Sequence, residues 1–123
     1  MDFFEAVRQR RSVRAFKPAE IPEETLVRIL ETMNLAPSAG NLQSYEVYVV
    51  RDVERKAALV TAARGQEFLL QAPIVLIFCA NARRAEAKYG MRGTDLYAVQ
   101  DASIACTYAM LAATAQELAS VWV

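Results

Sequence analysis

The sequence predicts an α+β fold, or a three-layer arrangement of helices and strands, in one domain that spans residues 1–123. Three observations support this prediction. A chain of 123 residues is long enough for one domain with a modest core. Its apolar residues make up 54%, too many for a disordered segment. Helical and strand-like segments follow one another in the order helix, helix, strand, helix, strand, helix, strand.

The first half of the chain predicts two helices and one strand. Residues 2–9 place their aromatic and aliphatic side chains on one helical face. A second helix is expected to begin at Pro22, because proline fits a first helical turn and the two glutamates that follow suit its positive end. This helix should stop before Pro37. Tyr45–Val50 is rich in β-forming residues and predicts a strand.

The second half predicts the remaining elements. A helix capped by Asp52 should extend to Ala63, with one or two further helical turns over residues 66–71. Residues 73–80 form a continuous apolar run, typical of a central strand that is buried on both faces. Charges and two glycines predict a loop with at most a turn of helix over residues 81–93.

The longest predicted helix covers residues 94–118 and carries a row of small side chains. Alanines recur along one face at spacings of four and three: Ala98, Ala102, Ala105, Ala109 and Ala112. Such a row lets another helix approach closely. The other faces are also apolar, so this helix should be central or buried by a partner chain. The final "SVWV" resembles the start of a further strand, and we expect a C-terminal part of the domain to be missing.

One dense basic cluster stands out in a chain whose 14 basic and 14 acidic residues balance. "RRSVR" contains Arg10, Arg11, Ser12 and Arg14. Guanidinium groups offer forked donors that match phosphate oxygens, and a serine hydroxyl adds a donor. Two other interpretations are a solvated basic surface and a nucleic-acid-binding patch. The second lacks interleaved aromatic residues and any basic excess elsewhere, so we expect no nucleic-acid partner.

A second candidate stretch is "APSAGNLQSYEV", residues 36–47, between a predicted helix and a strand. Its composition is ordinary for a connecting loop. The amides of Asn41 and Gln43 would also suit a planar polar heterocycle, with Ser38 beside them. Together with the arginine cluster, this stretch suits a ligand that has a phosphate at one end and a polar ring at the other.

Other residue types exclude several kinds of chemistry. The chain has no histidine, and Cys79 and Cys106 lie in separate apolar runs, so we expect no metal site and a bound cofactor as the source of any catalysis. No secretory leader is evident, which favours the cytoplasm. The longest uncharged run, residues 102–116, is too short and polar to span a bilayer, so no membrane partner is expected.

The chain resembles the FMN-dependent nitroreductase family. Four segments carry the resemblance, in the family's order: "RRSVRAF" (10–16), "APSAGNLQSYEVYVV" (36–50), "APIVLIFCA" (72–80) and "YAVQDASIACTYAMLAA" (97–113). The resemblance implies an α+β homodimer with a central sheet flanked by helices, FMN at the dimer interface, and a long interfacial helix around Asp101.

The resemblance also assigns residues to the cofactor. Arg10 and Arg14 would contact the phosphate and ribityl end of FMN, with Ser12 and the main chain of Arg11 near the flavin ring. From the other subunit, the ring would be lined by one loop, with Asn41 holding that loop in shape. The residues of this loop are Pro37, Ser38, Ala39, Asn41 and Gln43.

The implied activity is a ping-pong oxidoreduction. NADH or NADPH would reduce the flavin, which would then reduce a nitro compound, a quinone or a related small-molecule acceptor, and no catalytic protein side chain would be needed. The chain departs from the family's usual pattern at Ser44, where many members have proline, and in lacking the family's C-terminal segment. The alternative is therefore a non-catalytic dimer of the same fold that binds FMN weakly or not at all.

Overall fold

A computed structural model describes residues 1–123. Two helices precede each of the two strands, two more follow the second strand, and two irregular turns lie between elements. The helices are α1 (Phe3–Gln9), α2 (Glu23–Asn34), α3 (Val53–Ala62), α4 (Phe68–Gln71), α5 (Ala82–Arg92) and α6 (Ala98–Ala115), and the strands are β1 (Tyr45–Val50) and β2 (Val75–Ala80). A 3₁₀ turn covers Ala39–Asn41, and a π-helical turn over Gly93–Tyr97 leads into α6.

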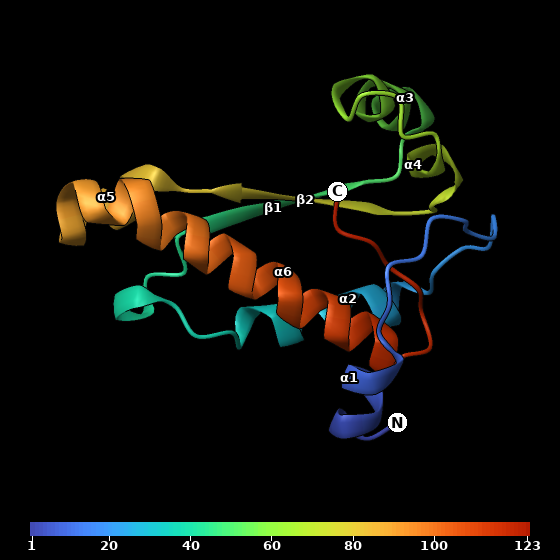
Figure 1. Ribbon diagram of the computed structural model, residues 1–123, viewed down its shortest axis with the longest axis horizontal. Helices are drawn as coiled ribbons and strands as arrows, with labels where there is room; N and C mark the ends of the chain where they lie inside the picture. Colours follow the sequence, from blue (N-terminus) through green and yellow to red (C-terminus); the bar gives the residue numbers. More distant parts are fainter.

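The two strands form an antiparallel sheet at the centre of the α+β fold. Val47 lies opposite Phe78, and Val49 lies opposite Leu76. Because successive side chains point to opposite faces of a strand, these residues share one face of the sheet, from which Val47, Leu76 and Phe78 pack on the core. Figure 1 shows α2 and α6 on this side of the sheet and α3 and α4 on the other, near one end of the strands.

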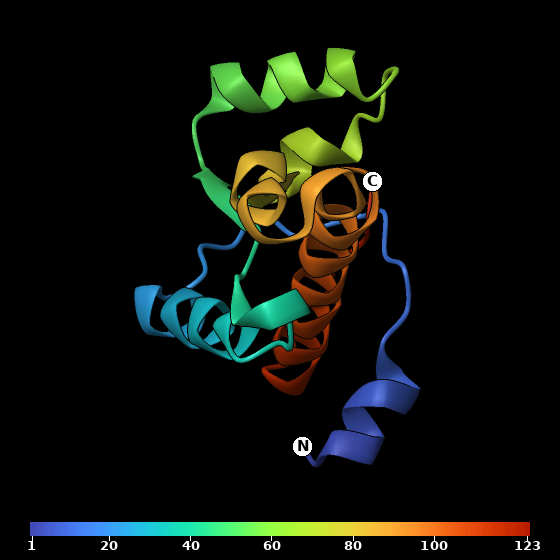
Figure 2. The same cartoon turned by 90° about the vertical axis from the view of Figure 1, so that its left-hand side faces the viewer.

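The alanine row on α6 forms the centre of the core. All five alanines are buried, and Ala105 is 0% exposed. Four of them, Ala102, Ala105, Ala109 and Ala112, pack with Ile29 and Met33 of α2 and with Tyr45 of β1. In Figure 2 the two helices lie side by side below the sheet. The row therefore lets a helix of the same chain approach, and the expectation of a central long helix is confirmed.

Several boundaries agree with the sequence. The observed bounds of four elements lie within the predicted ranges: α1, α2, β1 and α4. At the start of α3, the side chain of Asp52 accepts a hydrogen bond from the N–H of Arg55 at 2.9 Å, which confirms the predicted cap.

The loop predicted over residues 81–93 is wrong, because this segment forms α5. The Asn81 side chain accepts the N–H of Arg84 at 3.1 Å and so caps the helix. The residues that follow are mostly alanine, arginine, glutamate and lysine, all good helix formers. Gly90 adopts φ 56° and introduces a kink near the end of α5.

The structure corrects three other expectations. Strand β2 is only partly buried, because it pairs with β1 alone in a two-stranded sheet. The expected strand at "SVWV" is absent, and only a parallel bridge joins Ser120 to Ser12. Helix α6 begins at Ala98, after the π-helical turn, and stops at Ala115 instead of continuing to Leu118. It stops early because Glu117 adopts φ 61°, which no helix continues. None of the helices has the length and hydropathy needed to cross a membrane.

Candidate cofactor-binding site

The arginine segment, residues 10–16, follows α1 as extended chain. Arg11, Ser12 and Arg14 are exposed, and Arg10 is half-buried. The ion pairs of the chain join Arg51 to Glu23 and Arg84 to Glu46, so no guanidinium of the arginine segment is neutralised by a carboxylate. These groups are therefore available to an external anion.

Two contacts hold the arginine segment against the rest of the fold. The N–H of Val13 donates to the carbonyl of Ser120 at 3.1 Å. The N–H of Phe16 donates to Oε1 of Gln71 at 3.1 Å, and the Phe16 ring lies 6.4 Å from that of Phe68 on α4. The backbone that carries Arg14 is thus fixed on both sides, while its side chain stays free.

A hollow of about 640 Å³ lies beside this segment, between α1 and the chain that follows α6. Arg10 and Arg11 line it, and so do the carboxylates of Glu5 and Glu117. Arg14 and Ser12 do not line it. Because two carboxylates oppose two guanidinium groups there, the hollow is a poor site for an anion on its own.

The amide loop, residues 37–44, adopts an unusual backbone conformation. Gly40, Asn41 and Gln43 have φ values of 60°, 55° and 49°. These values lie in the left-handed region, which is energetically unfavourable for residues that carry a side chain. A Cβ on Gly40 would lie 2.6 Å from the hydroxyl of Tyr89 on α5, so glycine fits this position for space as well as for conformation.

Gln43 contributes most to the internal bonding of this loop. Its Nε2 donates to the carbonyl of Asn34 at 2.8 Å, and its N–H donates to Oγ of Ser38 at 2.9 Å. The side chain of Asn41 is exposed and has no such bond; only its backbone N–H donates, to the carbonyl of Ser38. The expectation that Asn41 holds the loop in shape is therefore corrected: Gln43 does so, and the Asn41 amide is free.

Asp101 ties the amide loop to α6. The residue is only 2% exposed. Its carboxylate accepts hydrogen bonds from the N–H of Ala39 at 3.0 Å and from the N–H of Ser44 at 3.3 Å. A proline at position 44 would have no N–H to donate, so this bond requires a residue other than proline there. Burial, and secondarily the nearby Asp101 charge, raises the pKa of Tyr45. Sequence reasoning named Asp101 only as part of the long helix and missed this role.

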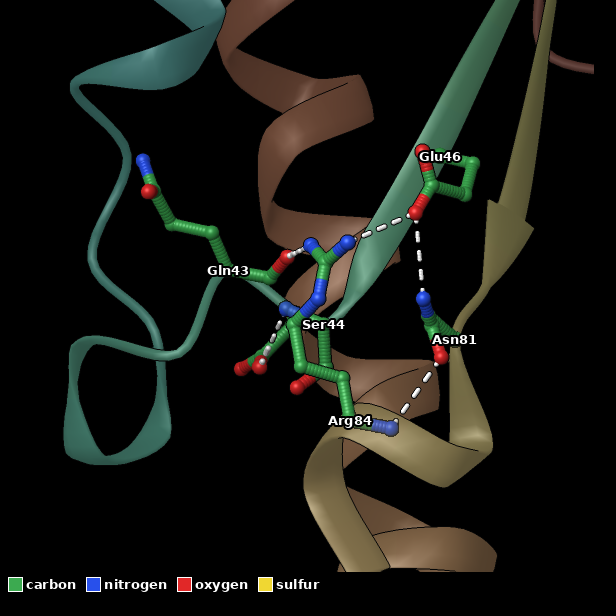
Figure 3. Close-up of polar contacts among 6 residues, drawn as sticks. Gln43, Ser44, Glu46, Asn81 and Arg84 are labelled. Carbon is green, nitrogen blue, oxygen red and sulfur yellow. Dashed lines mark hydrogen bonds and ion pairs between the residues drawn. The ribbon is translucent and has the colours of Figure 1, made fainter. Parts of the chain in front are cut away.

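Arg84 of α5 binds the same loop from the other side (Figure 3). Its Nη1 donates to the carbonyl of Gln43, and its Nη2 donates to Oε1 of Glu46, both at 2.7 Å. Asn81 supports this arrangement: its Nδ2 donates to the same Glu46 oxygen at 3.0 Å, and its N–H donates to the carbonyl of Ser44 at 2.8 Å. Sequence reasoning missed Arg84 because α5 was expected to be a loop.

One chain does not bring the arginine segment and the amide loop together. Asp101, near the start of α6, holds the loop, whereas Thr114, near its end, lines the hollow with Arg10 and Arg11. Thirteen residues separate 101 from 114, roughly 20 Å along a helix axis. In one chain, the arginine segment and the amide loop therefore lie toward opposite ends of α6.

Apolar side chains are exposed on two helices in positions that a second copy could cover. On α1, Phe4 is 70% exposed, and Phe3 beside it is also exposed. Outside the alanine row of α6, on what we call its outer face, Val99 is 53% exposed on one flank, and Ile104 and Tyr108 are partly exposed on the other. If α6 lies at a dimer interface, this outer face is the contact surface, since the chain's own core covers the alanines.

The comparisons with known proteins point to one family. The family model described as Nitroreductase family matches residues 7–66 and 56–123. The chain is 42% identical over 87 residues to an NADH dehydrogenase of Thermus thermophilus and 35% identical over 85 residues to the FMN reductase (NAD(P)H) of Bacillus subtilis. Nitroreductase A of Vibrio parahaemolyticus superposes with a TM-score of 0.87 at 26% identity, over 98% of this chain and 54% of that one.

The matches cover only part of these relatives. The aligned residues make up 71% of this chain but 42% of the Thermus protein, and 69% of this chain but 34% of the Bacillus protein.

Proposed function

Because the chain belongs to the nitroreductase family, we propose that it forms a homodimeric, FMN-dependent oxidoreductase that uses NADH or NADPH to reduce nitro compounds, quinones or related acceptors. One observation carries this proposal. The arginine segment presents guanidinium groups without carboxylate partners, and the amide loop of a second chain, held there by Asp101, would lie opposite them.

The residues present fit the chemistry of FMN. Arg10 and Arg14 suit a phosphate, which accepts forked hydrogen bonds from guanidinium groups. Ser12 adds an exposed hydroxyl, and the main chain of Arg11 lies beside it. With no charged side chain among residues 36–44, the amide loop suits a neutral polar ring.

The amide loop of the second copy would line the flavin. Pro37, Ser38 and Ala39 offer small and apolar surface, and Asn41 offers an amide that makes no bond within its own chain. Gln43 would act by holding the loop, as its bonds to Asn34 and Ser38 indicate. When bound, FMN supplies the electron transfer between nicotinamide and acceptor, so the protein needs to bind and orient but not to act as acid or base.

Flavin titration tests the proposal. Purified protein should quench FMN fluorescence, gain thermal stability with added FMN, and then oxidise NADH or NADPH in the presence of a quinone. The proposal would be contradicted if added FMN left the melting temperature of the protein unchanged and its fluorescence were not quenched. Binding without turnover would instead identify a non-catalytic dimer of the same fold.

A further inference from the structure

Arg84 is the external support of the amide loop. Its guanidinium lies between the loop and strand β1 and donates to Gln43 on one side and Glu46 on the other (Figure 3). The ion pair with Glu46 is nearly half exposed on both sides, and such pairs contribute little. The bond from Nη1 to the carbonyl of Gln43 is of a different kind, because it is a charge-assisted bond to a backbone group.

The carbonyl of Gln43 belongs to a residue that would not keep its conformation unaided. Gln43 adopts φ 49°, and left-handed residues other than glycine persist only where the surroundings fix them. Its carbonyl also accepts the N–H of Tyr45 at 2.8 Å, so Arg84 and β1 hold the same oxygen. Asp101 fixes the backbone N–H groups of Ala39 and Ser44 on the opposite side.

We propose that Arg84 is a positioning residue: with Asp101 it clamps residues 38–44 into the conformation that receives the ring of the cofactor. The cofactor part of this inference rests on the proposed function, whereas the clamp rests on contacts within one chain. A loop fixed before binding loses little entropy when the ligand arrives, so its affinity should depend on a side chain that never touches the ligand.

The test compares Arg84→Met with Arg83→Met. Arg83 is the neighbouring exposed arginine on α5 and forms no ion pair, so it controls for loss of charge and of helix propensity. Amide hydrogen exchange is measured first, without FMN. Arg84→Met should speed exchange at Gln43 and Ser44 by about tenfold, the effect of losing one charge-assisted bond. Arg83→Met should leave these amides unchanged.

FMN affinity is the second readout. Arg84→Met should raise the dissociation constant of FMN by about tenfold relative to Arg83→Met. Arg84→Lys, which keeps one donor for Gln43, should recover part of the affinity, and Glu46→Gln should change it little. Equal exchange in the two methionine variants would overturn the inference. If the unaltered protein fails to bind FMN, the proposed function fails, and the exchange data alone decide whether Arg84 clamps the loop.

Discussion

Arg14 lies between the two contacts that fix the arginine segment and has no partner of its own. We expect Arg14→Ala to weaken FMN binding by roughly 1–3 kcal/mol, the range for a hydrogen bond to a charged group. Fluorescence titration measures the loss, and Arg28→Ala, which removes an exposed arginine from α2, serves as the control. Unchanged affinity in Arg14→Ala would show that the phosphate lies elsewhere.

Cys106 makes the stability of the fold depend on pH. Burial raises the pKa of its thiol from 9.0 to about 11. Between these values the unfolded chain releases the proton while the folded chain keeps it, so the free energy of unfolding falls as pH rises through this window. A shift of this size corresponds to a loss on the order of 2–3 kcal/mol. Stability should be unaffected by this thiol below pH 9.

Urea unfolding at pH 7 and pH 10 measures this dependence. Cys106→Ala should lower stability at both pH values, since it opens a small cavity, but should flatten the difference between them. Cys79→Ala, at a half-buried thiol, should keep the difference seen in the unaltered protein. An identical pH dependence in Cys106→Ala would show that another group titrates.

At the residue scale, the sequence offered candidate residues for binding but not the residues that support them. The arginine and serine cluster could be recognised because unpaired guanidinium groups need no tertiary context to suggest an anion. Arg84 and Asp101 could not be recognised in the same way. Their partners are backbone groups of residues 41 and 57 positions away, at Gln43 and Ser44, and no local pattern encodes such pairings.

At the scale of elements, Ala105 tests what the alanine row does. It is 0% exposed and faces α2 and the sheet, so Ala105→Leu should destabilise the folded chain by roughly 1–3 kcal/mol through overpacking. Ala115→Leu makes the same change at an exposed position of α6 and should have little effect. Urea unfolding compares the two. A stable Ala105→Leu protein that only loses its dimer would place the row at the subunit interface instead.

The elements that the sequence predicted correctly have local causes. Asp52 caps α3, and the alternating β-formers of Tyr45–Val50 form β1. The errors have non-local causes. The apolar run of β2 suggested burial on both faces, yet burial depends on how many strands pair with it, and here there is one. Two glycines favoured the prediction of a loop in place of α5. The first of them, Gly90, interrupts the helix only near its end, so the helix forms despite it.

At the scale of the whole molecule, the placement of the two stretches implies that FMN binding and dimerisation are coupled. The arginine segment and the amide loop lie toward opposite ends of α6, so in the proposed dimer each chain would supply half of a site. The outer face of α6 and the exposed aromatic residues of α1 are the surfaces that a second copy would bury. A monomer should therefore bind FMN weakly even when every residue of both stretches is intact.

Val99→Asp tests this coupling. It places a carboxylate on the exposed outer face of α6, where burial without a partner is costly, and should raise the dissociation constant of the dimer by at least about tenfold. FMN affinity should fall with it. Val27→Asp, the same change at an exposed position of α2, should leave both unchanged. Sedimentation equilibrium measures assembly, and fluorescence measures FMN on the same samples. A monomeric Val99→Asp protein that binds FMN as tightly as the unaltered chain would show that one chain holds the whole site.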